Sequence, residues 1–159
     1  MTTFDSAPIS QDERVLAAIS HVSILMPMVG FFAPLIIWIT QKEKSRYVAF
    51  QSLQALAYQF AMILAYLLSM GCYVAAVFAP ILAMPFLASG SSEISPLIGA
   101  GFLFPFVVLA LIGLGAMVFV VYGLVAAVLA YQGKPFRYAL IGRFVERSMQ
   151  PKSSPSAAP

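Results

Sequence analysis

Residues 47–90 read YVAFQSLQALAYQFAMILAYLLSMGCYVAAVFAPILAMPFLASG and carry no formal charge. A second apolar run, residues 94–133, follows the single charged residue Glu93. Each run is far longer than the roughly 20 residues that a helix needs to cross a hydrocarbon core. The two runs predict an integral membrane protein in which both segments form long helices.

The composition of the chain also favours a lipid environment. Hydrophobic residues make up 61% of the 159 residues, and Asp, Glu, Lys and Arg make up 9%, whereas soluble domains carry roughly 25% charged residues. So few charges could not cover the surface of a water-soluble fold of this size. The net charge of +3 is modest, and its placement indicates membrane orientation rather than nucleic-acid binding.

The N-terminal residues 1–10 are expected to form a disordered tail. They are not expected to be a signal peptide, because Asp5 and Asp12 lie where a signal peptide would be positively charged. Ser10 with Glu13 forms a capping box for a first helix over residues 11–26.

Proline and glycine interrupt the sequence at PMVG, from Pro27 to Gly30, and a straight helix cannot continue through them. Two geometries remain open. Residues 15–40 form one kinked span, or PMVG is the tip of a tight hairpin between short helices over residues 11–26 and 31–41. The hairpin helices would be about 24 and 17 Å long, which is short for a full crossing.

The first long helix is expected to begin at Ser45 and to end at Pro80 and Pro85, because a proline inside a helix removes a hydrogen bond and clashes with the preceding turn. Pro96 suits the first turn of the next helix.

That second long helix should run to Gln132, with Gly133 as the residue after its C-cap. At about 54 Å it exceeds a bilayer, so Pro105 and the pair Gly99 and Gly101 are expected to break or bend its start.

The C-terminal part predicts a short amphipathic helix that lies on the membrane surface, followed by a disordered tail over residues 151–159. The resulting fold class is an all-α membrane protein. It has a bundle of three to four transmembrane helices and this interfacial helix, within one domain over residues 11–150.

Basic residues indicate the orientation of the chain. They gather in two segments, together with one interfacial tyrosine: Lys42, Lys44, Arg46, Arg137, Tyr138, Arg143 and Arg147. The loop over residues 88–96 has none. We therefore expect a multi-pass protein of the cytoplasmic (inner) membrane with a cytoplasmic C-terminus, while the side of the N-terminus stays open.

Five polar residues are candidates for an intramembrane cluster: His21, Gln51, Gln54, Tyr58 and Gln59. Three of them, Gln51, Gln54 and Tyr58, fall on one helical face. Polar groups in hydrocarbon need partners. The cluster is either a polar path or ligand contact, or an interhelical hydrogen-bond network that fixes packing.

Neither a metal centre nor a catalytic site is expected. One histidine, one cysteine (Cys72) and no carboxylate within the apolar runs cannot supply three or four metal ligands. The serines of the 88–96 loop lack a GxSxG pattern. The sequence implies no cofactor and no enzyme activity.

Small residues form a stripe on the second long helix: Ala116, Gly123, Ala127 and Ala130. Such a stripe lets helices approach closely. It packs within this chain, or against a second copy or another membrane protein.

Four passages resemble the Tic-twenty-like family of small bacterial membrane proteins, which is related to the channel-forming component of the chloroplast inner-envelope translocon. They are LAAISHVSIL (16–25), PLIIWITQKEKS (34–45), SRYVAFQSLQALAYQ (45–59) and FRYALIGRFV (136–145). The resemblance covers about residues 12–146 and implies four helices, both termini in the cytoplasm, and no enzyme activity.

Three functions therefore remain open. The first is a bundle protein that assists protein transport or membrane-complex assembly. The second is an accessory subunit of a larger membrane complex. The third is a small-solute or ion transporter, which would need a polar cavity connected to both faces of the membrane.

Overall fold

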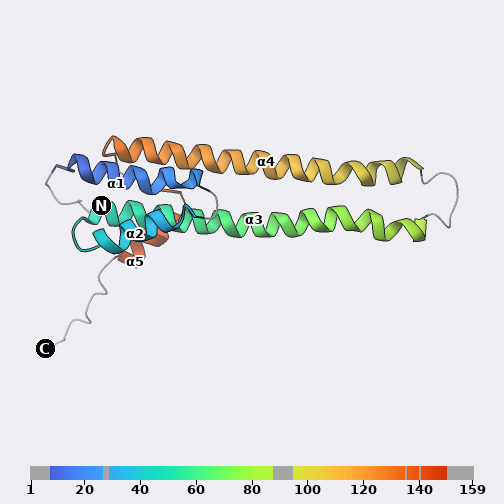
Figure 1. Ribbon diagram of the computed structural model, residues 1–159, viewed down its shortest axis with the longest axis horizontal. Helices are drawn as coiled ribbons and strands as arrows, with labels where there is room; N and C mark the ends of the chain where they lie inside the picture. The colour runs from blue at the N-terminus through green and yellow to red at the C-terminus, as the bar shows by residue number, and fades with distance from the viewer. Residues whose placement is uncertain (1–7, 27–28, 88–94, 135, 140, 150–159) are drawn as a thin grey trace, which may run out of the picture. The chain divides into compact units, whose positions relative to one another are not determined.

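The computed structural model describes residues 8–26, 29–87, 95–134, 136–139 and 141–149. Every regular element in these ranges is helical, which confirms the all-α prediction. The elements are α1 (Gln11–Val22), a 3-10 turn (Ser23–Leu25), α2 (Phe32–Gln41), α3 (Arg46–Leu87), α4 (Ser95–Tyr131) and α5 (Ile141–Met149) (Figure 1). Residues 1–7 and 151–159 of the expected tails, and 88–94 of the loop with Glu93, lie outside the described residues.

Two helices are long and apolar enough to cross a membrane, Arg46–Phe86 in α3 and Gly101–Tyr131 in α4. Only 6% of the most apolar window of the first is buried, and none of the second, so neither is the covered core helix of a soluble fold. α1 has 12 residues and α2 has 10, which is about 18 and 15 Å against a hydrocarbon core of about 30 Å. The predicted three to four crossings are not confirmed.

The chain divides into two compact units. The first unit comprises Met1–Phe60 and Val121–Pro159, and the second comprises Ala61–Val120. The first unit therefore contains α1, α2, α5, the beginning of α3 and the end of α4, while the second contains the remaining parts of α3 and α4.

The first unit begins with a helical hairpin, because α1 and α2 are separate helices that pack against each other. The 3-10 turn follows α1 directly, and the Gly30 N–H donates to the Met26 carbonyl over 2.8 Å. A Cβ at Gly30 would collide with the carbonyl oxygens of Ser23 and Met26, so the turn requires glycine. The two separate helices confirm the hairpin interpretation, and the single kinked span is wrong. Pro27 and Met28 of the expected tip lie outside the described residues.

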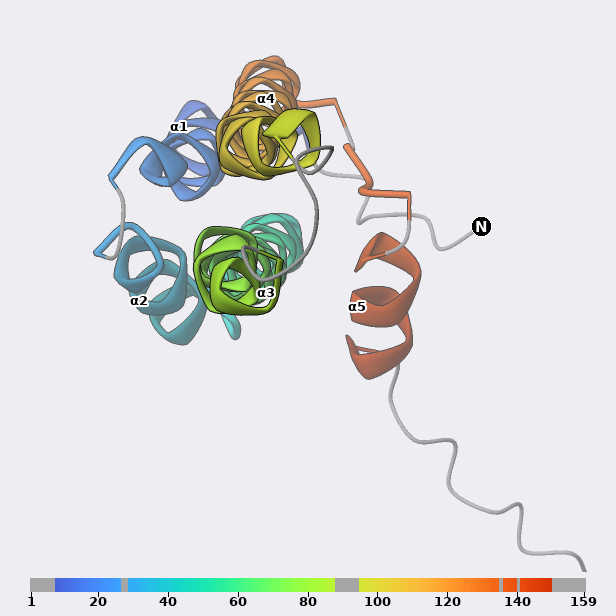
Figure 2. The ribbon, with the colours of Figure 1, turned by 90° about the vertical axis from the view of Figure 1, so that its right-hand side faces the viewer.

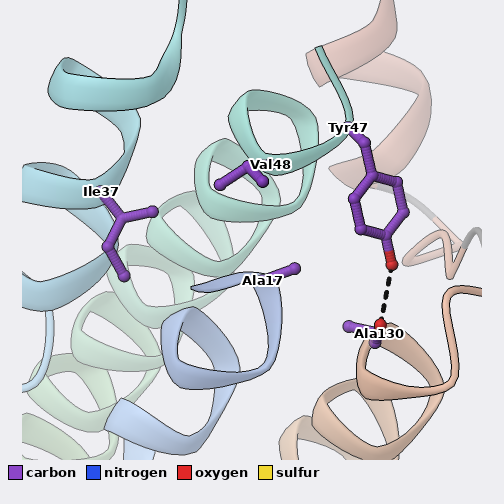
Figure 3. Close-up of a cluster of buried hydrophobic side chains, with 5 residues drawn as sticks. All are labelled: Ala17, Ile37, Tyr47, Val48 and Ala130. Atoms are coloured by element: carbon purple, nitrogen blue, oxygen red, sulfur yellow. Dashed lines mark hydrogen bonds between the residues drawn. The ribbon is translucent and has the colours of Figure 1, made fainter. Parts of the chain in front are cut away.

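Small and medium side chains form the apolar core of the first unit. In the end-on view α1 lies beside α4, and α2 lies beside α3 (Figure 2). The core cluster consists of Ala17, Ile37, Tyr47, Val48 and Ala130 (Figure 3). The Tyr47 hydroxyl donates to the Ala130 carbonyl over 2.9 Å. This hydrogen bond ties the start of α3 to the end of α4.

Side chains cap the N-termini of α1 and α3. Ser10 and Glu13 form the predicted capping box, in which the Ser10 N–H donates to the Glu13 carboxylate over 2.7 Å. The Ser45 hydroxyl accepts from the Val48 N–H at 3.3 Å. Each cap satisfies a backbone donor that has no partner within its own helix.

Gly133 ends α4 in a left-handed conformation with φ of 73°, which confirms its predicted place after the C-cap. Its N–H donates to the Ala130 carbonyl, and the Lys134 N–H donates to the Leu129 carbonyl. This pair of bonds is a Schellman motif, which glycine favours because it has no Cβ.

Proline does not end the long helices, contrary to the sequence prediction. α3 continues through Pro80 and Pro85 to Leu87, and α4 includes Pro105 with no break at its start. Proline removes one helical hydrogen bond, but helices in an apolar environment tolerate proline, so each helix continues on both sides of the missing bond.

α5 has the predicted amphipathic character. Val145 is buried, whereas Arg143 and Arg147 are exposed. The Gly142 N–H donates to the Tyr138 carbonyl over 2.9 Å, so α5 is joined to the segment that precedes it. Leu140, which the sequence places on the apolar face of this helix, lies outside the described residues.

Candidate functional site

His21 lies at the centre of a buried polar network in the first unit. Its side chain is 1% exposed. Its Nδ1 lies 3.2 Å from the Tyr138 hydroxyl, and its Nε2 lies 3.2 Å from Oε1 of Gln51. The imidazole thus bridges α3 and the segment after α4, and both ring nitrogens have partners.

The orientation of Gln51 determines the tautomer of His21. The Gln51 amide nitrogen donates to the Phe136 carbonyl over 3.3 Å, which turns its Oε1 toward the imidazole. An amide oxygen only accepts hydrogen bonds, so Nε2 of His21 carries the hydrogen and donates to Gln51. Nδ1 then accepts from the Tyr138 hydroxyl. In a neutral imidazole these two contacts define one tautomer, with the hydrogen on Nε2.

Gln54 binds the backbone of the segment between α4 and α5 with both ends of its amide. Its Nε2 donates to the Phe136 carbonyl over 3.1 Å, and its Oε1 accepts from the Tyr138 N–H at 3.0 Å. A Cβ at Gly142 would lie 3.1 Å from the same Oε1, so glycine there allows α5 to approach Gln54. One fully buried side chain therefore positions both the segment and the helix that follows it.

Aromatic rings surround the network. The Tyr58 and Tyr138 rings stack at 4.2 Å with planes 10° apart. Tyr122 meets the Tyr138 ring edge-on at 5.3 Å, and Phe136 meets it at 4.9 Å. Such pairs add about 0.5–1.5 kcal/mol each beyond the area that they bury. Tyr138 is thus held by both its hydroxyl and its ring.

Gln59 belongs to a second set of hydrogen bonds. Its Nε2 donates to the Ser23 hydroxyl over 2.8 Å, and the Ser20 and Ser52 hydroxyls lie 3.0 Å apart. These bonds join α1 and the turn after it to α3. No sequence pattern marked these three serines, because serine is common and its hydroxyl often bonds its own helix, as Ser20 also does with Leu16.

The basic residues are placed around the surface of the first unit. Exposed side chains are those of Lys42, Lys44, Arg46, Arg137, Arg143 and Arg147. Lys42 lies over the Trp38 ring at 5.8 Å, and Arg137 forms a 3.2 Å ion pair with Glu146. Tyr138, which the sequence grouped with these residues, is buried instead because its hydroxyl and ring are both engaged.

The small-residue stripe is divided between the two units. Gly123, Ala127 and Ala130 are buried in the first unit. A Cβ on Gly123 would lie 2.9 Å from Cδ1 of Ile24, so this glycine allows the turn after α1 to pack closely on α4. Ala116 lies in the second unit and is exposed.

Arg14 and Glu13 connect α1 to neighbouring helix ends. The Arg14 guanidinium lies against Gly133, where a Cβ would be 3.0 Å from its Nε. A cation at the C-terminus of α4 is favourable. The pKa of Glu13 lies below its usual value, chiefly because the Ser45 hydroxyl and the Ser10 N–H donate to the carboxylate.

The polar side chains of the network around His21 bind one another and backbone groups. Within the described ranges, no group of three or more His, Cys, Asp or Glu is placed to hold a metal ion. The contacts join α1 and α5 to the parts of α3 and α4 that belong to the first unit, and their chemistry is that of hydrogen bonds and stacked rings.

Residues 12–145 match the magnetosome magnetite crystal formation protein family. The chain belongs to this family. The resemblance to the Tic-twenty-like family is wrong. It rested on apolar helices, which resemble one another easily because few residue types suit lipid. The expectations taken from it alone, namely four helices and protein transport, lose that support. No curated protein and no solved structure matches the sequence.

Proposed function

We propose that the protein is a non-enzymatic membrane component that supports magnetite crystal formation by organising a membrane-protein assembly. Membership of the magnetosome magnetite crystal formation family is the observation that carries this proposal. The match covers residues 12–145 and so includes both the polar network and the two membrane-length helices.

The buried network favours a structural role over a catalytic one. His21, Gln51 and Gln54 are almost fully buried, and each has its hydrogen-bonding atoms paired with other groups of the chain. A catalytic or transport site needs polar atoms that can turn toward a substrate. Here the same atoms hold α1 and α5 to the long helices, which presents a defined surface to other membrane proteins.

We further propose two complete crossings, by α3 and α4, in the cytoplasmic membrane or a membrane derived from it. The α1–α2 hairpin enters the membrane without crossing it, because its helices span about half of a hydrocarbon core. Its tip turns back at Gly30. The basic residues after α2 and after α4 favour a cytoplasmic position for both the α2–α3 loop and the C-terminus.

The decisive experiment is complementation in a magnetite-forming bacterium that lacks its own members of the family. Crystal number and size are measured by electron microscopy with and without the tagged chain. The proposal expects a change toward the parental crystals and co-purification of other membrane proteins at fixed stoichiometry. Gln54→Leu, which disrupts the network, should weaken both results, while Gln132→Leu at an exposed position should not.

Two outcomes distinguish the alternatives. Unchanged crystals, despite normal amounts of the chain in the membrane, would overturn the role in crystal formation. Restored crystals without any co-purifying protein would contradict the assembly role. In that case, solute uptake by liposomes that contain only the purified chain would favour a transporter.

A further inference from the structure

The second unit contains an apolar cleft between its parts of α3 and α4. The cleft has a volume of about 580 Å³. Its lining residues include Cys72, Ala76 and Pro80 from α3, and Gly101 and Phe102 from α4. A Cβ on Gly101 would lie 3.2 Å from Cβ of Pro80, so the two helices approach closely here and small side chains leave space beside the contact.

Two of the lining residues carry backbone carbonyls that lack their usual helical donor. Proline has no N–H, so the carbonyl four residues before it is not paired within the helix. Pro80 frees the carbonyl of Ala76, and Pro105 frees the carbonyl of Gly101. Ala76 and Gly101 both line the cleft. An apolar cleft thus coincides with two backbone carbonyls, from two different helices, that lack their usual helical N–H donor.

Pro85, the other proline in the interior of these two helices, does not share this coincidence with the cleft. Pro85 frees the carbonyl of Ile81 in the same way. Ile81 is 49% exposed and is not among the residues that line the cleft. Pro85 therefore provides an internal control, since it makes the same change to the same helix away from the cleft.

We propose that the cleft binds an apolar molecule that carries a hydroxyl donor, of the class of long-chain or isoprenoid alcohols. The lining supplies contact for a hydrocarbon body, and its volume lies in the range of small-molecule sites. The freed carbonyls accept the hydroxyl hydrogen. Unpaired backbone groups in hydrocarbon cost free energy, so an alcohol satisfies a need that an alkane or the acyl chain of a lipid cannot.

Photocrosslinking tests this proposal on the full-length protein in phosphatidylcholine nanodiscs. The probes are a long-chain alcohol with a diazirine in its chain and the methyl ether of the same alcohol. The two share size and apolar surface, but the ether has no hydroxyl hydrogen. We expect the alcohol to label peptides that contain the cleft residues with about three- to tenfold higher yield, the ratio that one hydrogen bond in a membrane interior supports.

Proline variants identify the acceptors. Pro80→Ala and Pro105→Ala each restore an N–H that pairs the freed carbonyl, and the double variant should bring the alcohol-to-ether ratio close to one. Pro85→Ala should keep the ratio of the natural chain. Ala79→Leu, which fills the cleft, should reduce labelling by both probes.

Equal labelling by alcohol and ether in the natural chain would overturn the proposal, as would labelling spread evenly along the exposed faces of α3 and α4. A ratio that falls equally in Pro85→Ala and in the double variant would also overturn it, because the effect would then belong to the helix rather than to the cleft. Circular dichroism of each variant checks that its helices are intact.

Discussion

Gln51 and Gln54 are polar residues on a helix that is otherwise largely apolar. Both form hydrogen bonds with backbone atoms, and Gln51 also bonds the His21 side chain. The shared partner is the Phe136 carbonyl, which accepts from each of them. Because an unpaired amide is costly in an apolar surrounding, these two residues specify where the segment after α4 must lie. They act as positioning residues for the segment that contains Phe136 and Tyr138.

The tautomer of His21 is a prediction that depends on this pairing. Since Gln51 presents its amide oxygen to Nε2, the hydrogen should reside on Nε2 and be absent from Nδ1. Nitrogen-15 NMR of histidine-labelled protein can measure this, and the signals are unambiguous because the chain has one histidine. Tyr138→Phe should shift the Nδ1 signal and leave the hydrogen on Nε2. A hydrogen found on Nδ1 in the natural protein would contradict the network.

Gln54→Leu should lower the free energy of unfolding by about 1–3 kcal/mol, because the buried Tyr138 N–H loses its only described acceptor. A titration with denaturing detergent measures the change. Gln132→Leu is the matched control, since Gln132 is exposed and surface substitutions usually change stability by less than about 0.5 kcal/mol. Equal losses in the two variants would show that the backbone contacts of Gln54 contribute nothing specific.

Sequence patterns identified part of this site. Helical spacing placed Gln51, Gln54 and Tyr58 on one face, and a histidine in an apolar segment singled out His21. The backbone partners could not be predicted, because Phe136 and Tyr138 lie more than eighty residues further along the chain. Any extended segment offers the same N–H and carbonyl groups, so nothing in the sequence marks one as the partner.

At the scale of elements, helix ends follow local rules that were readable in advance. Ser10 with Glu13 and Gly133 act as predicted because each satisfies backbone groups within one turn of its own helix. The prolines do not follow such local rules, and the prediction that they end or break the long helices was wrong. Their effect depends on what surrounds the helix, and α3 and α4 continue past Pro80 and Pro105 despite the missing hydrogen bonds.

Gly133→Ala tests the end of α4. It should destabilise the first unit by about 1–2 kcal/mol, because a side chain at positive φ is strained and because the new Cβ would lie 3.0 Å from the Arg14 guanidinium. Gly115→Ala in the same helix is the control. No atom lies within 4 Å of its Cβ position, and alanine favours a helix over glycine by up to about 1 kcal/mol. A neutral Gly133→Ala would show that the Schellman geometry is not required.

At the scale of the whole molecule, the sequence correctly predicted two helices long and apolar enough to cross a membrane, because two uncharged runs decide this. The number of crossings depends on helix lengths that the sequence did not determine. α1 and α2 are two short helices that form a hairpin, so their apolar residues do not add up to one membrane-spanning helix. The family assignment could not come from these helices either, since similar apolar helices occur in unrelated membrane proteins.

The proposed two-crossing topology makes a direct prediction for labelling in membrane vesicles of known orientation. On a Cys72→Ser background, single cysteines replace Asp12, Lys42, Ser91 or Arg147, and a membrane-impermeant maleimide is added from one side. Asp12, Lys42 and Arg147 should label together from the cytoplasmic face, and Ser91 only from the opposite face, because α3 and α4 each cross once while the α1–α2 hairpin returns to its own side. If position 12 were labelled from the same face as position 91, the chain would have to cross the membrane an odd number of times before Lys42. The α1–α2 hairpin would then have to stretch across the bilayer and lose the packing that holds His21 against Gln51, so its stability should also fall on reconstitution.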